Sequence, residues 1–206
     1  MESSRVGTLG IVLALMMVSV TIPVSSNASE SSSCCPSQDF ELFIIGDPDN
    51  GQLTPFEADL EEEKSAEVTS SIFGEVEVGK WRLTWGADGE YSQGTWTFSI
   101  PYQVDDSTGV SGNATVLVKV GGSSYESSSE IPAFYLTSSG ELLVSVDVEN
   151  GQISKGDEVE LTFSVRSVIF SNPGGEAGVR FFWGTAENDA SLTLQFPLVN
   201  VQLREA

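Results

Sequence analysis

The residues best suited to chemistry in this sequence are carboxylates placed in short turns. Asp47, Asp49 and Asn50 lie within the segment GDPDNGQ, where their side-chain oxygens could converge on a hard cation. The spacing Asp-x-Asp-x-Gly matches part of an EF-hand calcium loop, but the twelfth position, where that loop carries a glutamate, is Ala58. A β-turn over Pro48–Gly51 would explain the same residues without a metal. The three residues are therefore a candidate calcium site, and a plain turn is the simpler interpretation.

Three tryptophans are candidates for a second kind of site. Trp81 and Trp85 share one face of an expected strand, and Trp96 begins the same pattern on the next long strand. Exposed indoles would form a platform on which sugar rings stack, as in carbohydrate-binding modules, whereas buried indoles would build the core. Their alternation with leucine and isoleucine favours the core. Tyr91, Tyr102 and Tyr125 are expected at the surface.

The usual catalytic groups are missing from the sequence. There is no histidine, which excludes Ser-His-Asp and Cys-His nucleophiles and the commonest zinc ligands. The two cysteines, Cys34 and Cys35, are adjacent in a serine-rich segment, where we expect an intermolecular or vicinal disulfide rather than an activated thiolate. No glycine motif for phosphates or dinucleotides occurs. Among 30 acidic residues no two stand out as a glycosidase pair, so the sequence predicts a non-catalytic protein.

The N-terminal segment has the features of an export signal. Met1–Arg5 contains one basic residue, Val6–Val24 is uncharged and mostly apolar, and small residues follow up to Ala28. This pattern predicts a signal peptide over residues 1–28, with a retained membrane anchor as the alternative. The segment RVGTLGI also resembles the class III signal peptides of archaeal pilins and archaellins, which implies cleavage after a glycine and a retained apolar helix. In each case the rest of the chain is expected outside the cytoplasm, where the sequons at Asn27 and Asn113 are candidate glycosylation sites.

The chain is strongly acidic. Its 30 acidic and 9 basic residues give a net charge of −21, and removal of residues 1–28 takes away one residue of each sign, Glu2 and Arg5. Such a charge excludes nucleic acids and anionic lipid head groups as partners, because both require a basic surface. The membrane is then a partner only through a retained N-terminal segment. The acidity suits a high-salt habitat, calcium at acidic turns such as Asp47–Asn50 and Asp105–Thr108, or solubility alone.

After a serine-rich linker, residues 29–38, the residue pattern is typical of one all-β domain, residues 39–206. Short runs of β-branched and aromatic residues alternate with polar ones between turn residues. This predicts an antiparallel β-sandwich of about ten strands, either a jelly roll or an immunoglobulin-like Greek key. The expected strands are Phe40–Ile45, Val68–Val78, Trp81–Trp85, Thr95–Val104, Ala114–Val120, Pro132–Thr137, Leu142–Val148, Glu158–Arg166, Val179–Trp183 and Leu192–Leu203, the last broken at Pro197.

Two regions allow finer predictions about strand pairing. Leu142–Val148 and Glu158–Arg166 alternate most regularly, and the turn residues between them predict a hairpin with a long tip. The acidic segment Phe56–Glu67 is the one part of the domain that we expect to be non-strand. Phe40–Ile45 is expected as the first strand of its own sheet, or else as a strand donated to a neighbouring chain's sheet edge, which would build a homopolymer.

Taken together, these features predict a secreted or cell-surface, non-catalytic β-sandwich with a structural, adhesive or filament-forming role. Its expected partners are other copies of the chain or cell-surface components. The alternative is an extracellular module that binds carbohydrate or calcium.

Overall fold

The computed structural model describes residues 37–69, 74–105, 107–131, 139–171 and 177–197. The chain divides into two units, Met1–Ser33 and Cys34–Ala206, and all of the described residues belong to the second. The predicted signal segment, both cysteines, Asn27 and the expected strand Pro132–Thr137 lie outside the described residues. Within them, no helix is long and apolar enough to cross a membrane.

The described residues form strands almost throughout, which confirms the all-β prediction. Apart from one short 3-10 helix, η1 (Glu57–Asp59), the described part of the chain contains thirteen strands. In chain order they are β1 (Ser37–Ile45), β2 (Gly51–Thr54), β3 (Glu61–Thr69), β4 (Val76–Thr84), β5 (Gly89–Tyr91), β6 (Gly94–Asp105), β7 (Ser107–Val120), β8 (Ser123–Ile131), β9 (Ser139–Val148), β10 (Gly151–Ile153), β11 (Glu158–Ser171), β12 (Gly178–Thr185) and β13 (Ser191–Pro197).

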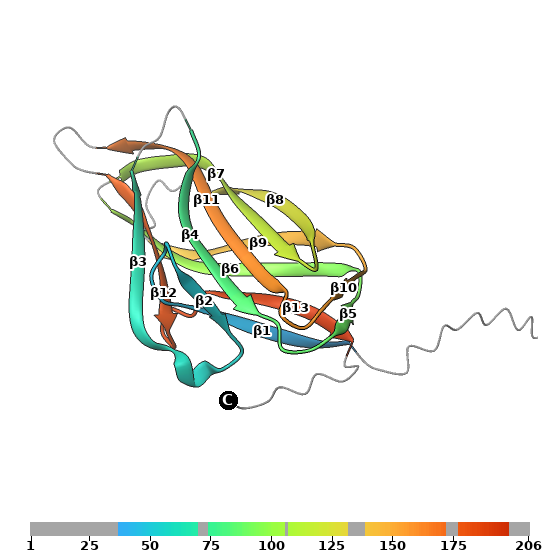
Figure 1. Cartoon of the computed structure of the whole chain (residues 1–206). Helices are drawn as coiled ribbons and strands as arrows, with labels where there is room; N and C mark the ends of the chain where they lie inside the picture. Colours follow the sequence, from blue (N-terminus) through green and yellow to red (C-terminus); the bar gives the residue numbers. More distant parts are fainter. Residues whose placement is uncertain (1–36, 70–73, 106, 132–138, 172–176, 198–206) are drawn as a thin grey trace, which may run out of the picture. The chain divides into compact units, whose positions relative to one another are not determined.

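Eleven of these strands belong to one large sheet (Figure 1). Its order is β3-β12-β6-β13-β1-β2-β4-β11-β7-β8, with β9 paired to β6, while β5 and β10 form a separate two-stranded sheet. The sheet is mixed because β2 runs parallel to β4, in contrast to the antiparallel pairing predicted throughout. β1 lies between β13 and β2 of its own chain, as expected for a first strand in its own sheet.

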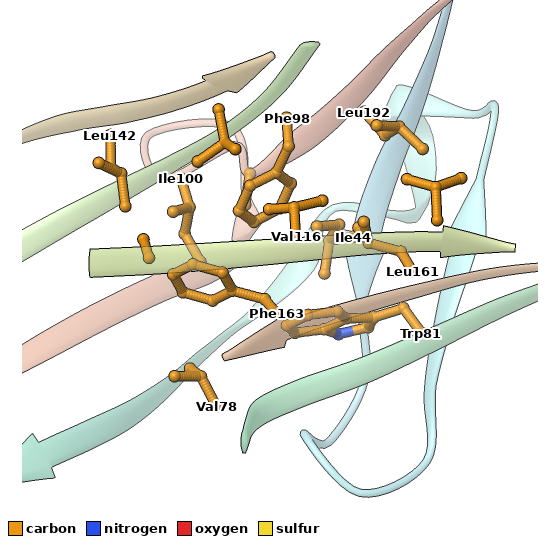
Figure 2. Packing of buried hydrophobic residues seen from close by; sticks show 14 of the residues in the cluster. Ile44, Val78, Trp81, Phe98, Ile100, Val116, Leu142, Leu161, Phe163 and Leu192 are labelled. Carbon is orange, nitrogen blue, oxygen red and sulfur yellow. The ribbon is translucent and has the colours of Figure 1, made fainter. Parts of the chain in front are cut away.

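The core is built from aromatic rings that meet across this sheet (Figure 2). Phe163 of β11 contacts Phe98 of β6 and Phe181 of β12, with ring centroids 5.1 Å apart in both pairs. Trp81 of β4 meets Trp183 of β12 edge to face at 5.3 Å. All five rings are fully buried. Since β11 and β4 are not neighbours of β6 or β12 in the sheet order, the sheet curves so that distant strands enclose one core.

Two glycines make room for the indole of Trp81. A Cβ atom on Gly51 of β2 would lie 2.0 Å from Cδ1 of Trp81, and one on Gly79 would lie 2.4 Å from its Cη2. Gly51 and Trp81 are register partners in the parallel β2–β4 pair. The glycines therefore allow the backbone to pass directly against the indole.

The predicted hairpin is wrong, although both of its strands exist. β9 pairs with β6, whereas β11 pairs with β4 and β7. The expected hairpin tip contains β10, which pairs with β5. Alternation along a strand determines which side chains face the core, but it carries no information about the neighbouring strand.

The sequence prediction also missed two strands with polar character. β3 begins at Glu61, inside the acidic segment expected to be non-strand, and most of its side chains are exposed. β8 has the sequence SSYESSSEI and alternates between exposed and half-buried positions. Within the described residues, β3 pairs only with β12 and β8 only with β7. Both are edge strands, where charged and small polar side chains are common because one side of the strand faces solvent.

Candidate functional site

The most concentrated charge cluster in the described residues surrounds Glu160 of β11. The strand register places Glu160 opposite Arg82 on β4 and Lys119 on β7. One carboxylate oxygen accepts hydrogen bonds from Lys119 Nζ at 2.8 Å and lies 3.2 Å from Lys80 Nζ, and the other accepts from Arg82 Nε at 2.9 Å. Three cations from two neighbouring strands therefore share one carboxylate.

The electrostatics of this cluster hold Glu160 in its ionised form. Its side chain is only 11% exposed, whereas the side chains of Arg82 and Lys119 are 47% exposed. Burial by itself raises the pKa of Glu160, but the hydrogen bonds from Lys119, Lys80 and Arg82 outweigh it and lower the pKa from 4.5 to about 2. A carboxylate with so low a pKa is a poor proton donor near neutral pH. Its evident role is to tie β4, β11 and β7 together.

The acidic turn singled out as a calcium candidate is closed by a hydrogen bond. The backbone N–H of Asn50 donates to the carbonyl oxygen of Asp47 at 3.2 Å, so the turn spans Asp47–Asn50, one residue earlier than expected. The carboxylate of Asp47 lies 3.1 Å from Lys64 Nζ, and Asp49 is exposed. Among the described residues, no three His, Cys, Asp or Glu side chains are grouped so that they could hold a metal ion.

The three candidate tryptophans lie in the core. Trp81 and Trp96 are fully buried and Trp85 is 7% exposed, so none of these indoles offers a ring face for stacking a sugar. The expectation that Tyr91 and Tyr102 lie at the surface is wrong, since both are buried. The hydroxyl of Tyr91 donates to the carbonyl oxygen of Val120 at 3.3 Å, which provides a partner for its polar end. A buried tyrosine needs only one such partner, and a sequence pattern does not reveal it.

The second acidic turn is only partly described. Asp105 lies 3.6 Å from Arg180, which also pairs with Glu67 at 3.4 Å. Asp106 lies outside the described residues. The visible part of this turn is thus a surface ion pair between β6 and β12.

A hollow of about 350 Å³ opens where β7, β8 and β11 lie side by side. Its lining includes Asn113, Glu130, Arg166 and Ser167. The register places Arg166, Asn113 and Glu130 in one row across the three strands, and all three are exposed. Ser167 is 1% exposed, and its Oγ has no hydrogen-bond partner in the described part of the structure. The hollow therefore offers a cation, an amide and a carboxylate, whereas the Ser167 hydroxyl is inaccessible from it, because successive side chains of a strand point to opposite faces.

Sequence reasoning identified Asn113 but missed the other features of these two clusters. The signal for the charge cluster was the pair Lys80 and Arg82, two residues apart on one strand, in a chain with only 9 basic residues. Nothing in the sequence connects them with Glu160 or Lys119, because the strand order brings these residues together. The row of Arg166, Asn113 and Glu130 has the same origin.

These features define the chain as an all-β protein with a curved sheet and an acidic surface. No family model and no curated protein sequence matches it. Among solved structures, two crystal structures of a CocE/NonD family hydrolase from Staphylococcus aureus are similar, each with a TM-score of 0.50, at 11% and 8% sequence identity. The similarity covers 78% of this chain and 36% or 37% of the hydrolase chain. The chain thus spans little more than a third of the hydrolase, and at this identity the likeness is one of fold alone.

Proposed function

We propose that this chain is a secreted or cell-surface β-sandwich with a structural, adhesive or filament-forming role and no catalytic activity. In this proposal β4, β11, β7 and β8 form one layer, and β12, β6, β9, β13 and β1 form the other. The ring contacts from Phe163 to Phe98 and Phe181 support two facing layers, because they join strands that are not neighbours in the sheet. The N-terminal apolar segment is assigned to export.

The observation that carries this proposal is the division of side chains between core and surface. The tryptophans considered for a sugar platform, Trp81, Trp85 and Trp96, are buried in the core, whereas the exposed rings among the described residues are those of Phe56 and Phe170. The exposed positions of β3 and β8 carry mainly carboxylates and serines. A stable core inside a strongly anionic shell is suited to a scaffold that stays soluble and presents its surface to others.

The free edges offer a route to assembly. β3 and β8 each have one unpaired side within the described residues, so either could pair with a strand of another chain. The exposed carboxylates of Glu61, Glu62 and Glu63 on β3 would oppose such pairing at low salt and allow it when salt screens them. Filament formation should therefore depend on ionic strength.

Two other functions have weaker support. The similarity to a hydrolase is one of fold at 8% to 11% identity, and it extends over 36% or 37% of that enzyme's chain. For calcium, the Asp47 carboxylate is already paired with Lys64. A scaffold role needs neither a catalytic pair nor a metal.

The proposal is tested on full-length chain expressed with its own N-terminal segment. Cells, cell surface and medium are separated, and the recovered protein is sized by light scattering and viewed by electron microscopy at low and high salt, with calcium and with a chelator. We expect recovery outside the cytoplasm, as assemblies or bound to the cell surface, without dependence on calcium. A monodisperse monomer shed into the medium under every condition would refute a structural or adhesive role.

A further inference from the structure

We propose that Asn113 carries an N-linked glycan, and that the first sugar of this glycan binds in the hollow between Arg166 and Glu130. The inference rests on the proposed export of the chain, because N-glycosylation takes place on exported segments. It goes beyond that proposal by naming the modified atom and the surface that receives the sugar.

The acceptor position has the geometry that a glycan requires. Asn113, Ala114 and Thr115 form a sequon, and β7 alternates so that Ala114 is fully buried while Asn113 is exposed. The amide therefore points away from the core. The Thr115 hydroxyl lies 3.1 Å from that of Ser128 on β8, so the rest of the sequon is held by the neighbouring strand. A glycan on Asn113 would be compatible with the folded sheet.

The surface beside the acceptor is suited to a sugar ring. Arg166 and Glu130 lie on the strands to either side of Asn113 in the same cross-strand row, one as a donor and the other as an acceptor for sugar hydroxyls. Gly112 contributes no side chain to the lining, and the backbone of β11 passes close to it, since a Cβ there would lie 2.3 Å from the carbonyl oxygen of Arg166. The hollow, at about 350 Å³, is within the size range of small-molecule sites.

The covalent step needs a donor of one chemical class, a lipid-linked oligosaccharide pyrophosphate or phosphate. A bond forms between Nδ2 of Asn113 and C1 of the first sugar, and the bond from C1 to the phosphate oxygen breaks. The phosphate leaves with the lipid carrier, and the proton lost from the amide nitrogen passes to a base of the transferase. No electron transfer is involved, and the transferase of the exporting cell supplies the catalysis.

The first experiment tests the modification. Full-length chain is expressed in a host that performs N-glycosylation, and its intact mass is compared with those of Asn113→Gln, Thr115→Ser and Thr115→Ala. We expect added sugar mass in the wild type and Thr115→Ser, and its loss from Asn113 in the other two. Gln152→Thr is the positive control, because it completes a sequon at the exposed Asn150. Modification at Asn150 but not at Asn113 would overturn this inference alone, whereas modification at neither would also count against export.

The second experiment tests whether the first sugar of the glycan binds in the hollow. The rate at which peptide N-glycosidase releases the glycan from folded protein is measured for the wild type, Arg166→Ala and Lys155→Ala, the last removing an exposed cation elsewhere. We expect release from Arg166→Ala to be about fivefold faster, the factor for losing roughly one net hydrogen bond, and Lys155→Ala to match the wild type. Equal rates in all three would show a glycan that does not use the hollow. If Asn113 stays unmodified and free sugar binds Asn113→Gln in an Arg166-dependent way, the sugar is a ligand and the modification is refuted.

Discussion

Replacing Glu160 by glutamine would remove the carboxylate that joins β4, β11 and β7 while changing the shape of the side chain very little. The pKa of Glu160 is lowered in the folded protein, so the ionised carboxylate contributes stability at pH values above 4.5, and this contribution is lost as the pH falls through about 2. Lowering the pKa from 4.5 to about 2 corresponds to about 3 kcal/mol, at about 1.4 kcal/mol per pH unit.

We expect the loss in the free energy of unfolding at pH 7 to be about 2–3 kcal/mol, because Arg82 and Lys119 remain half exposed and water solvates them once the carboxylate is gone. Urea unfolding followed by tryptophan fluorescence would measure it at several pH values between 7 and 2. The difference between wild type and Glu160→Gln should shrink steadily below pH 4.5 and be close to zero near pH 2.

The matched control is Glu158→Gln on the same strand, where the side chain is exposed. Its effect at pH 7 should stay within about 0.5 kcal/mol. If Glu160→Gln costs no more than this control, or if its cost is the same at every pH, the ion cluster does not stabilise the fold in the way described.

The core and its close contacts lead to three further predictions. Gly51→Ala would place a methyl carbon 2.0 Å from Trp81 and should lower the free energy of unfolding by about 1–3 kcal/mol. An unchanged urea midpoint for this variant would contradict the close approach of β2 and β4. Phe163→Ala should lower the free energy of unfolding by about 3–5 kcal/mol, because its ring is fully buried. Phe170→Ala, at a side chain that is 56% exposed, should lower it by less than about 1 kcal/mol. Equal losses for the two variants would refute the assignment of Phe163 to the core. Burial raises the pKa of Tyr91 above its ordinary value of 10. An alkaline absorbance titration should therefore show tyrosine that ionises late, and Tyr91→Phe should reduce that amount. The protein should also lose stability as the pH rises through 10, because Tyr91 ionises in the unfolded chain before it does in the folded protein. If the wild type and Tyr91→Phe show the same amount of late-ionising tyrosine in the folded state, Tyr91 is not buried as described.

The period-two patterns were the most reliable part of the sequence prediction. β6, β7, β9 and β11 all contain the stretch expected for them, and the tryptophans favoured for the core are in it. The polar strands β3 and β8 were missed because an edge strand buries little and needs few apolar residues. Hydrophobic alternation is therefore a good guide to strands with one buried face and a poor one to sheet edges.

The sequence by itself determined the all-β class, the acidic surface and the core face of the main strands. These follow from local chemistry, because burial of apolar area favours the same side chains whichever strand they pack against. Only the tertiary structure decided which strands are neighbours. Glu160 lies 78 residues from Arg82 and 41 from Lys119, and the row of Arg166, Asn113 and Glu130 joins three strands. Such groupings arise from the order and register of strands, which depend on the packing of the whole core and on no single segment.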